Sequence, residues 1–353
     1  MRRNRGRYAL VLAADDLILD ALAERAGEAW VADVFPFPPS PERITMMRSK
    51  IAFLAAAREA DLPIPRSVTV ADRAAAREAA AAIGFPIMLK RSAGAGGNGV
   101  CRIDDAAELA ARFDDFACGE ALTLEEFCVG AVGGTEVFFQ HGVPACWTSQ
   151  RKVVCWPTAF GPSAIRRFVD EPEMAAILTR VGTMTQFHGF ATVCWIRRND
   201  RGLRLIEMNF RPGVGMHLRP HIEPLYAAAV AATLARVTYA GTRTFASPDR
   251  LTPLFPQALY AGIAHGTLGS TFALALRNGW DIPFDEPRLL LAHAHELAAW
   301  LRARARKPLE SGNYPPTLTP LIPKSGGIKW PALQASAKTA APKATISKPF
   351  RNG

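Results

Sequence analysis

Three polar side chains occupy alternate positions in the segment IEMNFR, in the second half of the chain. Glu207, Asn209 and Arg211 alternate there with apolar residues, and a strand places all three on one face because its side chains have a period of two. A carboxylate and an amide oxygen are hard ligands of the kind Mg²⁺ prefers, and a guanidinium binds phosphate or carboxylate with paired hydrogen bonds. The pattern predicts a magnesium site for a nucleoside triphosphate. An edge strand with a solvated polar face fits the same residues and remains open.

A second chemical feature is Lys90, at the end of a predicted strand over residues 85–90. It precedes the segment RSAGAGGNG, where glycines occupy positions 94, 96, 97 and 99. Small residues allow backbone N–H groups to approach phosphate oxygens, and the lysine adds a positive charge. The lysine precedes the glycines and residues 100–103 are predicted as a strand, so neither a Walker A loop nor a dinucleotide fingerprint fits. A plain glycine-rich hairpin remains the alternative.

The composition is that of an ordinary globular protein, with 353 residues, 49% hydrophobic and 21% charged. No apolar run approaches the roughly 20 residues that span a bilayer, so no membrane partner is predicted. Six cysteines without a CxxC spacing favour a reduced, cytoplasmic protein. Of the net charge of +10, six charges come from five Lys and one Arg from residue 324 onward. The folded part has no stripe of basic and aromatic residues, so no specific nucleic-acid partner is predicted.

The order of predicted elements favours an α+β fold over a single doubly wound sheet, because hairpin signals occur among helices. One such signal is the pair His141 and Gly142, and another is the segment NDRG at 199–202. The remaining elements on which the argument depends are a mostly apolar strand over 8–14, helices over 15–29 and 41–60, and a mostly helical stretch over 245–306.

Five segments, in this order, resemble the ATP-grasp superfamily of carboxylate ligases. They are RSKIAFLAAAREADLPIPRS, FPIMLKRSAGAGGNGV, LTLEEFCVG, TEVFFQHGVPAC and FATVCWIRRNDRGLRLIEMNFRPG. Each motif alone is weak, whereas their order and spacing make the set more specific. The resemblance covers about residues 44–240.

The resemblance implies an ATP-grasp fold in which two α+β lobes grip ATP. It also implies a truncated Rossmann-like N-terminal lobe and a helical C-terminal extension. The expected boundaries are 1–40 for the partial N-terminal lobe, 41–128 for the small lobe with the glycine-rich loop, 129–245 for the large lobe with the magnesium strand, 246–306 for the helical extension and 307–353 for a disordered basic tail.

The same resemblance implies which residues bind the nucleotide. Two lysines contact the phosphates, and residues of the glycine-rich loop surround them; these are Lys50, Lys90, Ser92, Gly96, Gly97 and Gly99. A solvated helix lysine remains the alternative for Lys50. The strand that lines the adenine contains Glu125, Glu126 and Cys128.

Further roles follow for the acidic and basic groups of the large lobe. Glu136 would hold the ribose hydroxyls, and an ordinary strand carboxylate is its alternative. Glu207 and Asn209 would hold Mg²⁺, with Mn²⁺ as an alternative ion. Arg211 and Lys90 would be the catalytic residues, and Arg211 would stabilise the phosphoryl group or the acyl phosphate.

Two features depart from the family pattern. The family usually has another carboxylate ligand about thirteen residues before the position of Glu207, where this chain has Cys194. A neutral thiol is a poor ligand for Mg²⁺, so either one metal ion suffices, another acid such as Asp200 reaches the site, or activity is reduced. In addition, only 49 residues precede Lys50, which is short for the expected first lobe.

The expected function is an ATP- and Mg²⁺-dependent ligase. It would activate a carboxylate as an acyl phosphate, which an amine or a thiol then captures. A non-catalytic ATP-binding or regulatory ATP-grasp protein is the second hypothesis, and a small-molecule kinase of the same superfamily is the third. The expected partners are small carboxylate and amine substrates, and a homodimer is left open.

Overall fold

The fold is known from a computed structural model. The structure describes residues 8–92, 99–117, 120–199, 202–213, 223–239, 242–243, 251–279 and 282–306. All of these belong to one contact unit.

Three short helices near the N-terminus place Lys50. They are α1 (Asp16–Ala23), α2 (Pro41–Arg48) and α3 (Lys50–Glu59). The single helix predicted over 41–60 is wrong, because the extended backbone of Ser49 ends α2 and begins α3. The Ser49 hydroxyl accepts from the N–H of Ala52, which is the bond of a helix N-cap. Lys50 is therefore the first residue of α3.

The strand predicted over residues 8–14 is also wrong. The structure describes these residues as bends and irregular backbone, and α1 is shorter than the helix predicted over 15–29. Leu12 and Ala13 still pack against hydrophobic clusters of the large sheet. The apolar run is thus used for packing, while a strand would also need a neighbouring edge for its hydrogen bonds.

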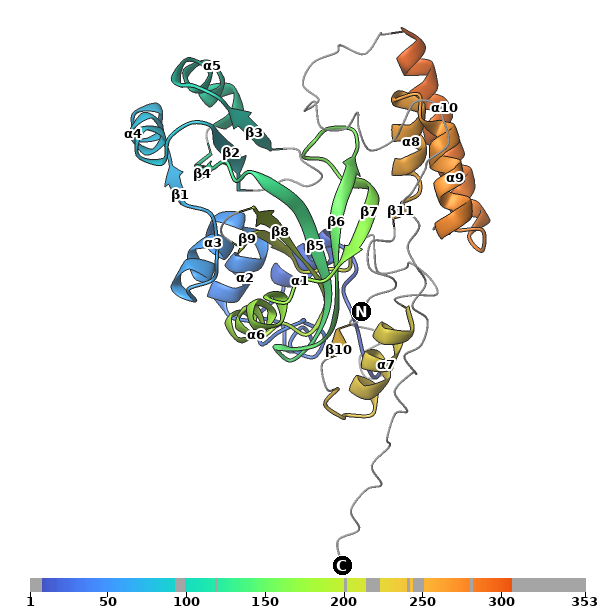
Figure 1. Cartoon of the computed structure of the whole chain (residues 1–353). Helices are drawn as coiled ribbons and strands as arrows, with labels where there is room; N and C mark the ends of the chain where they lie inside the picture. The colour runs from blue at the N-terminus through green and yellow to red at the C-terminus, as the bar shows by residue number, and fades with distance from the viewer. Residues whose placement is uncertain are drawn as a thin grey trace, which may run out of the picture. The chain divides into compact units, whose positions relative to one another are not determined.

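A four-stranded antiparallel sheet carries Lys90. Its order is β1 (Ser67–Val70), β4 (Leu122–Glu126), β2 (Ile87–Arg91) and β3 (Val100–Ile103). The helices α4 (Arg73–Ile83) and α5 (Ala106–Ala117) lie beside this sheet (Figure 1). They bury alanines and Phe113 against fully buried strand residues such as Leu89 and Leu124. This apolar core fixes β2, the strand that carries Lys90.

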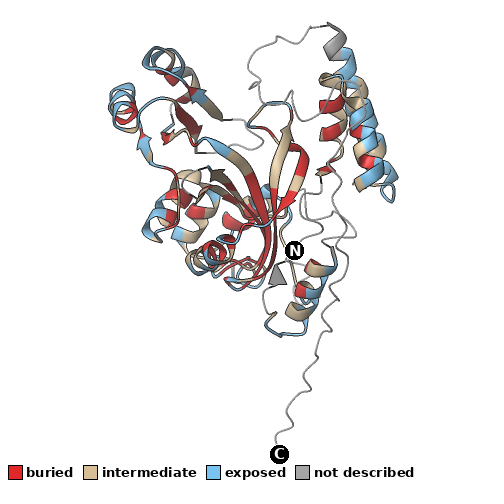
Figure 2. Cartoon of the chain, in the orientation of Figure 1, coloured by how far each residue is buried: buried red, intermediate tan, exposed pale blue. Residues whose placement is uncertain are grey.

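A seven-stranded sheet carries Glu207. Its order is β11 (Leu251–Pro253), β7 (Ser163–Val169), β6 (Val143–Cys155), β5 (Gly130–Gln140), β8 (Gly189–Arg198) and β9 (Gly202–Asn209), and β10 (Thr242–Arg243) pairs with β6. The hairpins predicted at His141 and at 199–202 join β5 to β6 and β8 to β9. The strand β7 was not predicted, and its pairing with the long strand β6 places it near the other edge. The central strands are largely buried (Figure 2).

The two faces of this sheet have different chemistry. One face packs Val193, Trp195 and Leu205 against α6 (Met174–Thr185) and the N-terminal helices. The opposite face carries rows of directly paired polar positions, since Asn209 pairs with Thr192 and Thr192 with Glu136. Paired residues of neighbouring strands share a face. The sheet is therefore a platform with an apolar side and a polar side.

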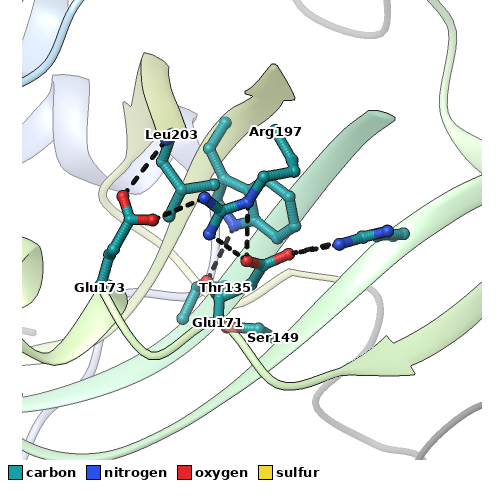
Figure 3. Close-up of polar contacts among 8 residues, drawn as sticks. Thr135, Ser149, Glu171, Glu173, Arg197 and Leu203 are labelled. Carbon is teal, nitrogen blue, oxygen red and sulfur yellow. Dashed lines mark hydrogen bonds and ion pairs between the residues drawn. The ribbon is translucent and has the colours of Figure 1, made fainter. Parts of the chain in front are cut away.

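An ion-pair network fixes β8 near the start of α6. The guanidinium of Arg197 contacts both Glu171 and Glu173, and the distance from its Nε to Glu171 Oε2 is 2.9 Å (Figure 3). Glu171 is almost fully buried and also pairs with Arg151 at 3.1 Å. In the same close-up Thr135 and Ser149 share a hydroxyl hydrogen bond of 2.8 Å. These contacts fix β8, and the neighbouring strand β9 carries Glu207.

The last described elements are helical apart from the short strands β10 and β11. They are α7 (Glu223–Leu234), α8 (Gln257–Ala264), α9 (Leu268–Asn278) and α10 (Pro287–Arg306). The stretch predicted as mostly helical over 245–306 thus contains three of these helices, and β11 also lies in it. None of the helices in the described ranges has the length and apolar character needed to cross a bilayer.

Candidate nucleotide and metal site

The structure brings together Lys50 and Glu207, which lie 157 positions apart in the chain. Lys50 Nζ lies 2.9 Å from Glu207 Oε2, and both side chains are about a quarter exposed. Burial alone would raise the pKa of Glu207, but the charge and hydrogen bond of Lys50 outweigh it and lower that pKa below its ordinary value. Glu207 is therefore an ionised carboxylate at the edge of the polar face.

Asn209 and Cys194 lie beside this carboxylate. Cys194 is the direct partner of Glu207 in the β8–β9 ladder, and its Sγ lies 3.9 Å from Asn209 Nδ2. Because the amide nitrogen faces the thiol, the amide oxygen is the atom left for a metal ion. Burial and the charge of Glu207 raise the pKa of Cys194 to about 12, so the thiol is neutral.

Lys90 forms a second pair, with Glu125 on the adjacent strand. Lys90 is the direct partner of Thr123, so Glu125 is its diagonal neighbour on the same face. The distance from Lys90 Nζ to Glu125 Oε1 is 2.5 Å, and the side chains are 10% and 2% exposed. Glu125 Oε2 is buried without a hydrogen-bond partner among the described residues. Burial raises the pKa of Glu125 although the charge of Lys90 opposes this.

The glycine-rich loop is described only at its two ends. The Ser92 hydroxyl lies 3.0 Å from the Ser49 hydroxyl, and the Ser92 carbonyl accepts from the N–H of Lys50. Gly99 has a positive φ of 83°, which glycine adopts without strain. Gly96 and Gly97 lie outside the described residues. The loop therefore leaves β2 directly beside the N-terminus of α3.

A cavity of about 280 Å³ opens at the Lys50–Glu207 pair. Its polar lining comes from four places: α1, the junction of α2 with α3, the residue after β2, and β9. These polar residues are Asp16, Asp20, Arg48, Ser49, Lys50, Ser92, Glu207 and Asn209. Its apolar lining includes Leu19, Met46, Phe53 and Phe210, which are nearly fully buried. Predicted metal and phosphate residues thus line one small-molecule cavity.

Arg211 and the N-terminal helix meet next to this cavity. Arg211 Nε lies 2.7 Å from Asp16 Oδ2, and Arg211 is about a quarter exposed. Asp20 similarly lies 2.8 Å from Arg48. Both pairs therefore tie α1 to segments that carry predicted site residues, because Arg211 follows Asn209 and Arg48 precedes Lys50.

Residues 49–126 match the family model of the carbamoyl-phosphate synthase L chain, ATP binding domain. No curated protein matches the chain by sequence. The matched segment contains Lys50, the glycine-rich loop and the strand that ends in Glu126, and it is followed by the larger sheet, in which β9 carries Glu207. The chain has the ATP-grasp fold. The predicted resemblance to the ATP-grasp superfamily is confirmed.

Solved structures match the chain with low sequence identity. Pyruvate carboxylase from Rhizobium etli is 24% identical over 60% of this chain and 20% of that chain, with a TM-score of 0.47. A biotin carboxylase–βγ-ATP complex from Campylobacter jejuni is 17% identical over 60% and 50%, with a TM-score of 0.49. Phosphoribosylamine–glycine ligase from Thermotoga maritima is 17% identical over 60% and 59%, also with 0.49. The chain spans less than two thirds of each of these proteins.

Within the ATP-grasp fold, Glu136 lies deeper than a ribose-binding residue would suggest. It is fully buried and accepts from Arg166 at 3.0 Å, from the Thr192 hydroxyl at 2.6 Å and from the Gly213 N–H at 3.2 Å. Both carboxylate oxygens thus have protein partners. The ribose role stays a prediction, and it requires that one of these bonds be exchanged for a ribose hydroxyl.

The predicted adenine strand ends in residues with protein partners. Glu126 Oε2 lies 3.2 Å from Arg66, and Arg198 lies 3.4 Å from Glu126 Oε1. Cys128 is buried, and burial raises its pKa to about 11. The structure does not bring Glu125, Glu126 or Cys128 into the cavity lining. Their contact with an adenine stays a prediction of the ATP-grasp resemblance.

The donor set fits one Mg²⁺ ion. Glu207 supplies an ionised oxygen, and Asn209 supplies an amide oxygen on the same face. Among the described residues, no three His, Cys, Asp or Glu side chains gather in a way that could hold a metal ion. Mg²⁺ is commonly held by one or two protein groups together with substrate phosphates and water, and the residues of this site match that mode.

The sequence reasoning missed several polar residues of the site. Asp16 and Asp20 read only as ordinary residues of a predicted helix, although their spacing of four places them on one face. Arg166 is buried against Glu136. Its burial follows from the strand β7, for which local sequence gives a weak signal. These residues can be assigned to the site only from contacts between segments that are distant in the sequence.

Proposed function

We propose that the chain is an ATP- and Mg²⁺-dependent ligase that activates a substrate carboxylate as an acyl phosphate. The observation that carries the proposal is the contact of Lys50 with Glu207 at the wall of a small-molecule cavity. Phosphoryl transfer needs both a phosphate-binding lysine and a metal-binding carboxylate at the same triphosphate. Their contact supports a site where Mg²⁺ and phosphate meet.

The proposed reaction has two steps. The γ-phosphoryl group is transferred from ATP to a carboxylate oxygen, and ADP leaves. An amine nitrogen, or less often a thiol, then attacks the acyl carbon; the new C–N or C–S bond forms as the C–O bond to phosphate breaks. The proton of the nucleophile is lost and phosphate is released. When bound, Mg²⁺ neutralises charge on the terminal phosphates during transfer.

The residues of the site would mainly position groups and neutralise charge. Lys50 leaves Glu207 for a phosphate oxygen, and Glu207 together with Asn209 then faces the metal ion. Lys90, which lies on β2, would exchange its contact with the carboxylate of Glu125 for a contact with phosphate. Each lysine thus keeps a negative partner, and Glu207 gains the metal ion. Glu125 loses its cation, which favours its protonated form because burial already raises its pKa. Arg211 would stabilise the phosphoryl group as it moves.

A second candidate is an ATP-binding protein without turnover. Cys194 favours it, because its neutral thiol stands opposite Glu207 where the family usually places another carboxylate ligand. One metal ion would then bind with fewer charged ligands. The two candidates differ in turnover and not in ATP binding, so a single pair of measurements separates them.

The test combines ATP binding with an ADP-release screen of the full chain. We expect Mg²⁺-dependent ATP binding by calorimetry, and ADP release that requires both a carboxylate and an amine or thiol. The matched control is Asp61→Asn, because Asp61 is a fully exposed residue paired with Arg180 outside this cavity. ADP release from a carboxylate alone, with a stable phosphorylated product, would indicate a kinase. Binding of ATP without release in any mixture would support the second candidate.

A further inference from the structure

Glu136 carries a fully buried carboxylate on the polar face of the seven-stranded sheet. Arg166 Nη1 donates to its Oε1 at 3.0 Å. The Thr192 hydroxyl and the Gly213 N–H both donate to its Oε2, at 2.6 Å and 3.2 Å. Arg166 and Thr192 lie on β7 and β8, whereas Gly213 lies beyond the end of β9. The carboxylate therefore joins the sheet to the segment that follows the metal-binding strand.

The backbone of Gly213 lies directly against this carboxylate. A Cβ atom at position 213 would lie 2.4 Å from both carboxylate oxygens of Glu136 and 2.5 Å from Thr192 Oγ1. These distances are well inside the roughly 3.5–4.0 Å of an ordinary van der Waals contact, so the close approach requires glycine. A ribose hydroxyl would have to displace this backbone to reach Glu136. The described contacts therefore favour another role.

Arg211 lies between two fixed points of the chain. On one side Phe210 is nearly fully buried in the apolar core of the sheet. Its ring packs against three other aromatic rings, those of Phe37, Phe53 and Phe187. On the other side Pro212 restricts its own φ, and Gly213 is held by Glu136. With an anchor on each side, the backbone has little freedom to move Arg211.

We infer that Glu136 is a positioning residue, which holds Gly213 and thereby fixes Arg211 at the transferred phosphoryl group. This inference rests on the proposed ligase activity, in which Arg211 stabilises that group. In the described structure Arg211 contacts Asp16 through Nε at 2.7 Å. A guanidinium has five N–H donors, so donors remain for phosphate oxygens. In this role Glu136 acts through Arg211 and contacts no substrate.

The role needs an acid and not an amide at position 136. Glu136 accepts at both oxygens, from Arg166 at one and from Thr192 and Gly213 at the other. A glutamine has one acceptor oxygen and one NH₂ group. Its NH₂ group would face either the guanidinium or the Gly213 N–H, so at least one donor would lose its acceptor. Glu136→Gln should therefore loosen the segment that carries Arg211.

The test uses aluminium fluoride, which imitates the transferred phosphoryl group beside MgADP and requires no knowledge of the carboxylate substrate. The full chain is saturated with MgADP and titrated with aluminium fluoride by calorimetry. We expect Arg211→Met to weaken the binding of aluminium fluoride about tenfold or more, as loss of a charged hydrogen bond implies. Glu136→Gln and Gly213→Ala should weaken it by a similar factor. The affinity for MgADP should stay within about twofold.

A combined variant shows whether Glu136 acts through Arg211. Arg211→Met together with Glu136→Gln should bind aluminium fluoride no more weakly than Arg211→Met alone, because both changes remove the same interaction. A second measurement addresses the ribose role. We expect the ratio of affinities for ADP and 2′,3′-dideoxy-ADP to be the same in Glu136→Gln and in the unmodified chain. A ribose-binding carboxylate would instead lose that preference on substitution.

Two control variants separate positioning from stability. Glu171→Gln also removes a nearly fully buried carboxylate that is paired with arginines, and Glu171 does not line the cavity. It should lower the unfolding temperature and retain aluminium fluoride binding. Gly269→Ala is the control for Gly213→Ala, because no atom lies within 4 Å of a Cβ added at position 269. It should change neither quantity.

The outcomes separate this inference from the proposed activity. Unchanged aluminium fluoride affinity in Glu136→Gln and Gly213→Ala, or additive losses in the combined variant, would overturn the positioning role. So would loss of the preference for ADP over its dideoxy form. If Glu136→Gln fails to fold, Gly213→Ala with and without Arg211→Met provides the same comparison. If the unmodified chain binds MgADP but no aluminium fluoride, the proposed phosphoryl transfer is contradicted and the positioning role falls with it.

Discussion

Each of the two lysines predicted to bind phosphate is paired with a glutamate, and the two pairs differ in their access to water. Lys90 and Glu125 lie on adjacent strands of the four-stranded sheet and are almost fully buried. Lys50 and Glu207 join α3 to the edge strand β9, and each is about a quarter exposed. The first pair is fixed by strand register inside one sheet. The second pair forms only where two separate elements meet.

The difference in burial predicts different consequences for stability and for function. A buried pair that loses one partner leaves an uncompensated charge, which is costly. A partly exposed pair is screened by water and contributes little to stability. The Lys90–Glu125 pair should therefore matter for both folding and nucleotide binding. The Lys50–Glu207 pair should matter almost only for function.

The largest effect is expected for Lys90→Met. The substitution leaves Glu125 buried without its cation, and we expect a loss of about 3–5 kcal/mol in the free energy of unfolding. Burial already raises the pKa of Glu125. A carboxyl group with a raised folded-state pKa favours folding at low pH and loses that contribution as pH rises through the folded pKa. The free energy of unfolding of the variant, measured by urea denaturation, should thus be lower at about pH 8 than at about pH 5.

A double variant separates the two roles of Lys90. Lys90→Met combined with Glu125→Gln removes both charges and should recover most of the lost stability, while affinity for ATP stays low. A single variant that unfolds like the unmodified chain at every pH would show that water reaches Glu125. Recovery of ATP affinity in the double variant would show that Lys90 does not contact phosphate.

The next effect is expected for Glu207→Gln. This change keeps the size of the side chain and removes the charge that would face Mg²⁺. We expect turnover to fall about hundredfold or more, as when one electrostatic group at a transition state is lost. The free energy of unfolding should change by less than about 1 kcal/mol, because the pair with Lys50 is partly exposed. Unfolding of the variant together with no Mg²⁺ dependence in the unmodified chain would make Glu207 a structural residue.

The contrast between the pairs also shows what local sequence can predict. Glu207 and Asn209 were found from alternation within one strand, and the hairpin before them from the segment NDRG. The strand that carries Lys90 was similarly visible from its apolar run, and β2 ends one residue beyond the predicted position, at Arg91. These features depend on residues close in sequence, where strand period and turn chemistry operate. Their positions could be predicted without knowledge of the rest of the fold.

Other features depend on distant partners and were missed. The apolar run at residues 8–14 was predicted as a strand, but no neighbouring edge is paired with it in the described structure. The strand β7, which carries Arg166 and Arg167, was not predicted. Arg166 is buried because Glu136, on another strand, compensates its charge. The break at Ser49 had a local signal, since serine is a preferred N-cap, yet the surrounding helical pattern concealed it.

The smallest effect is expected for Cys194→Asp, which tests the surroundings of Glu207 in the more exposed pair. The change places a second carboxylate opposite Glu207, where burial and that neighbouring charge now raise the pKa of the thiol to about 12. The same surroundings would raise the pKa of the new aspartate. Without metal, the variant should therefore lose stability as pH rises from about 5 to about 8.

Added Mg²⁺ should reverse that loss. A second carboxylate supplies the hard oxygen that the thiol lacks, and we expect Mg²⁺ to bind about three- to tenfold more tightly, or about 0.7–1.4 kcal/mol. Calorimetry with a non-hydrolysable ATP analogue measures this change. Cys194→Val, similar in size and without a side-chain oxygen, is the matched control and should show no gain. If the aspartate variant is destabilised with and without Mg²⁺ and binds the ion no better, position 194 packs as part of the sheet and does not face the metal. In that case the polar edge of β9 would hold a single metal ion through Glu207 and Asn209 alone.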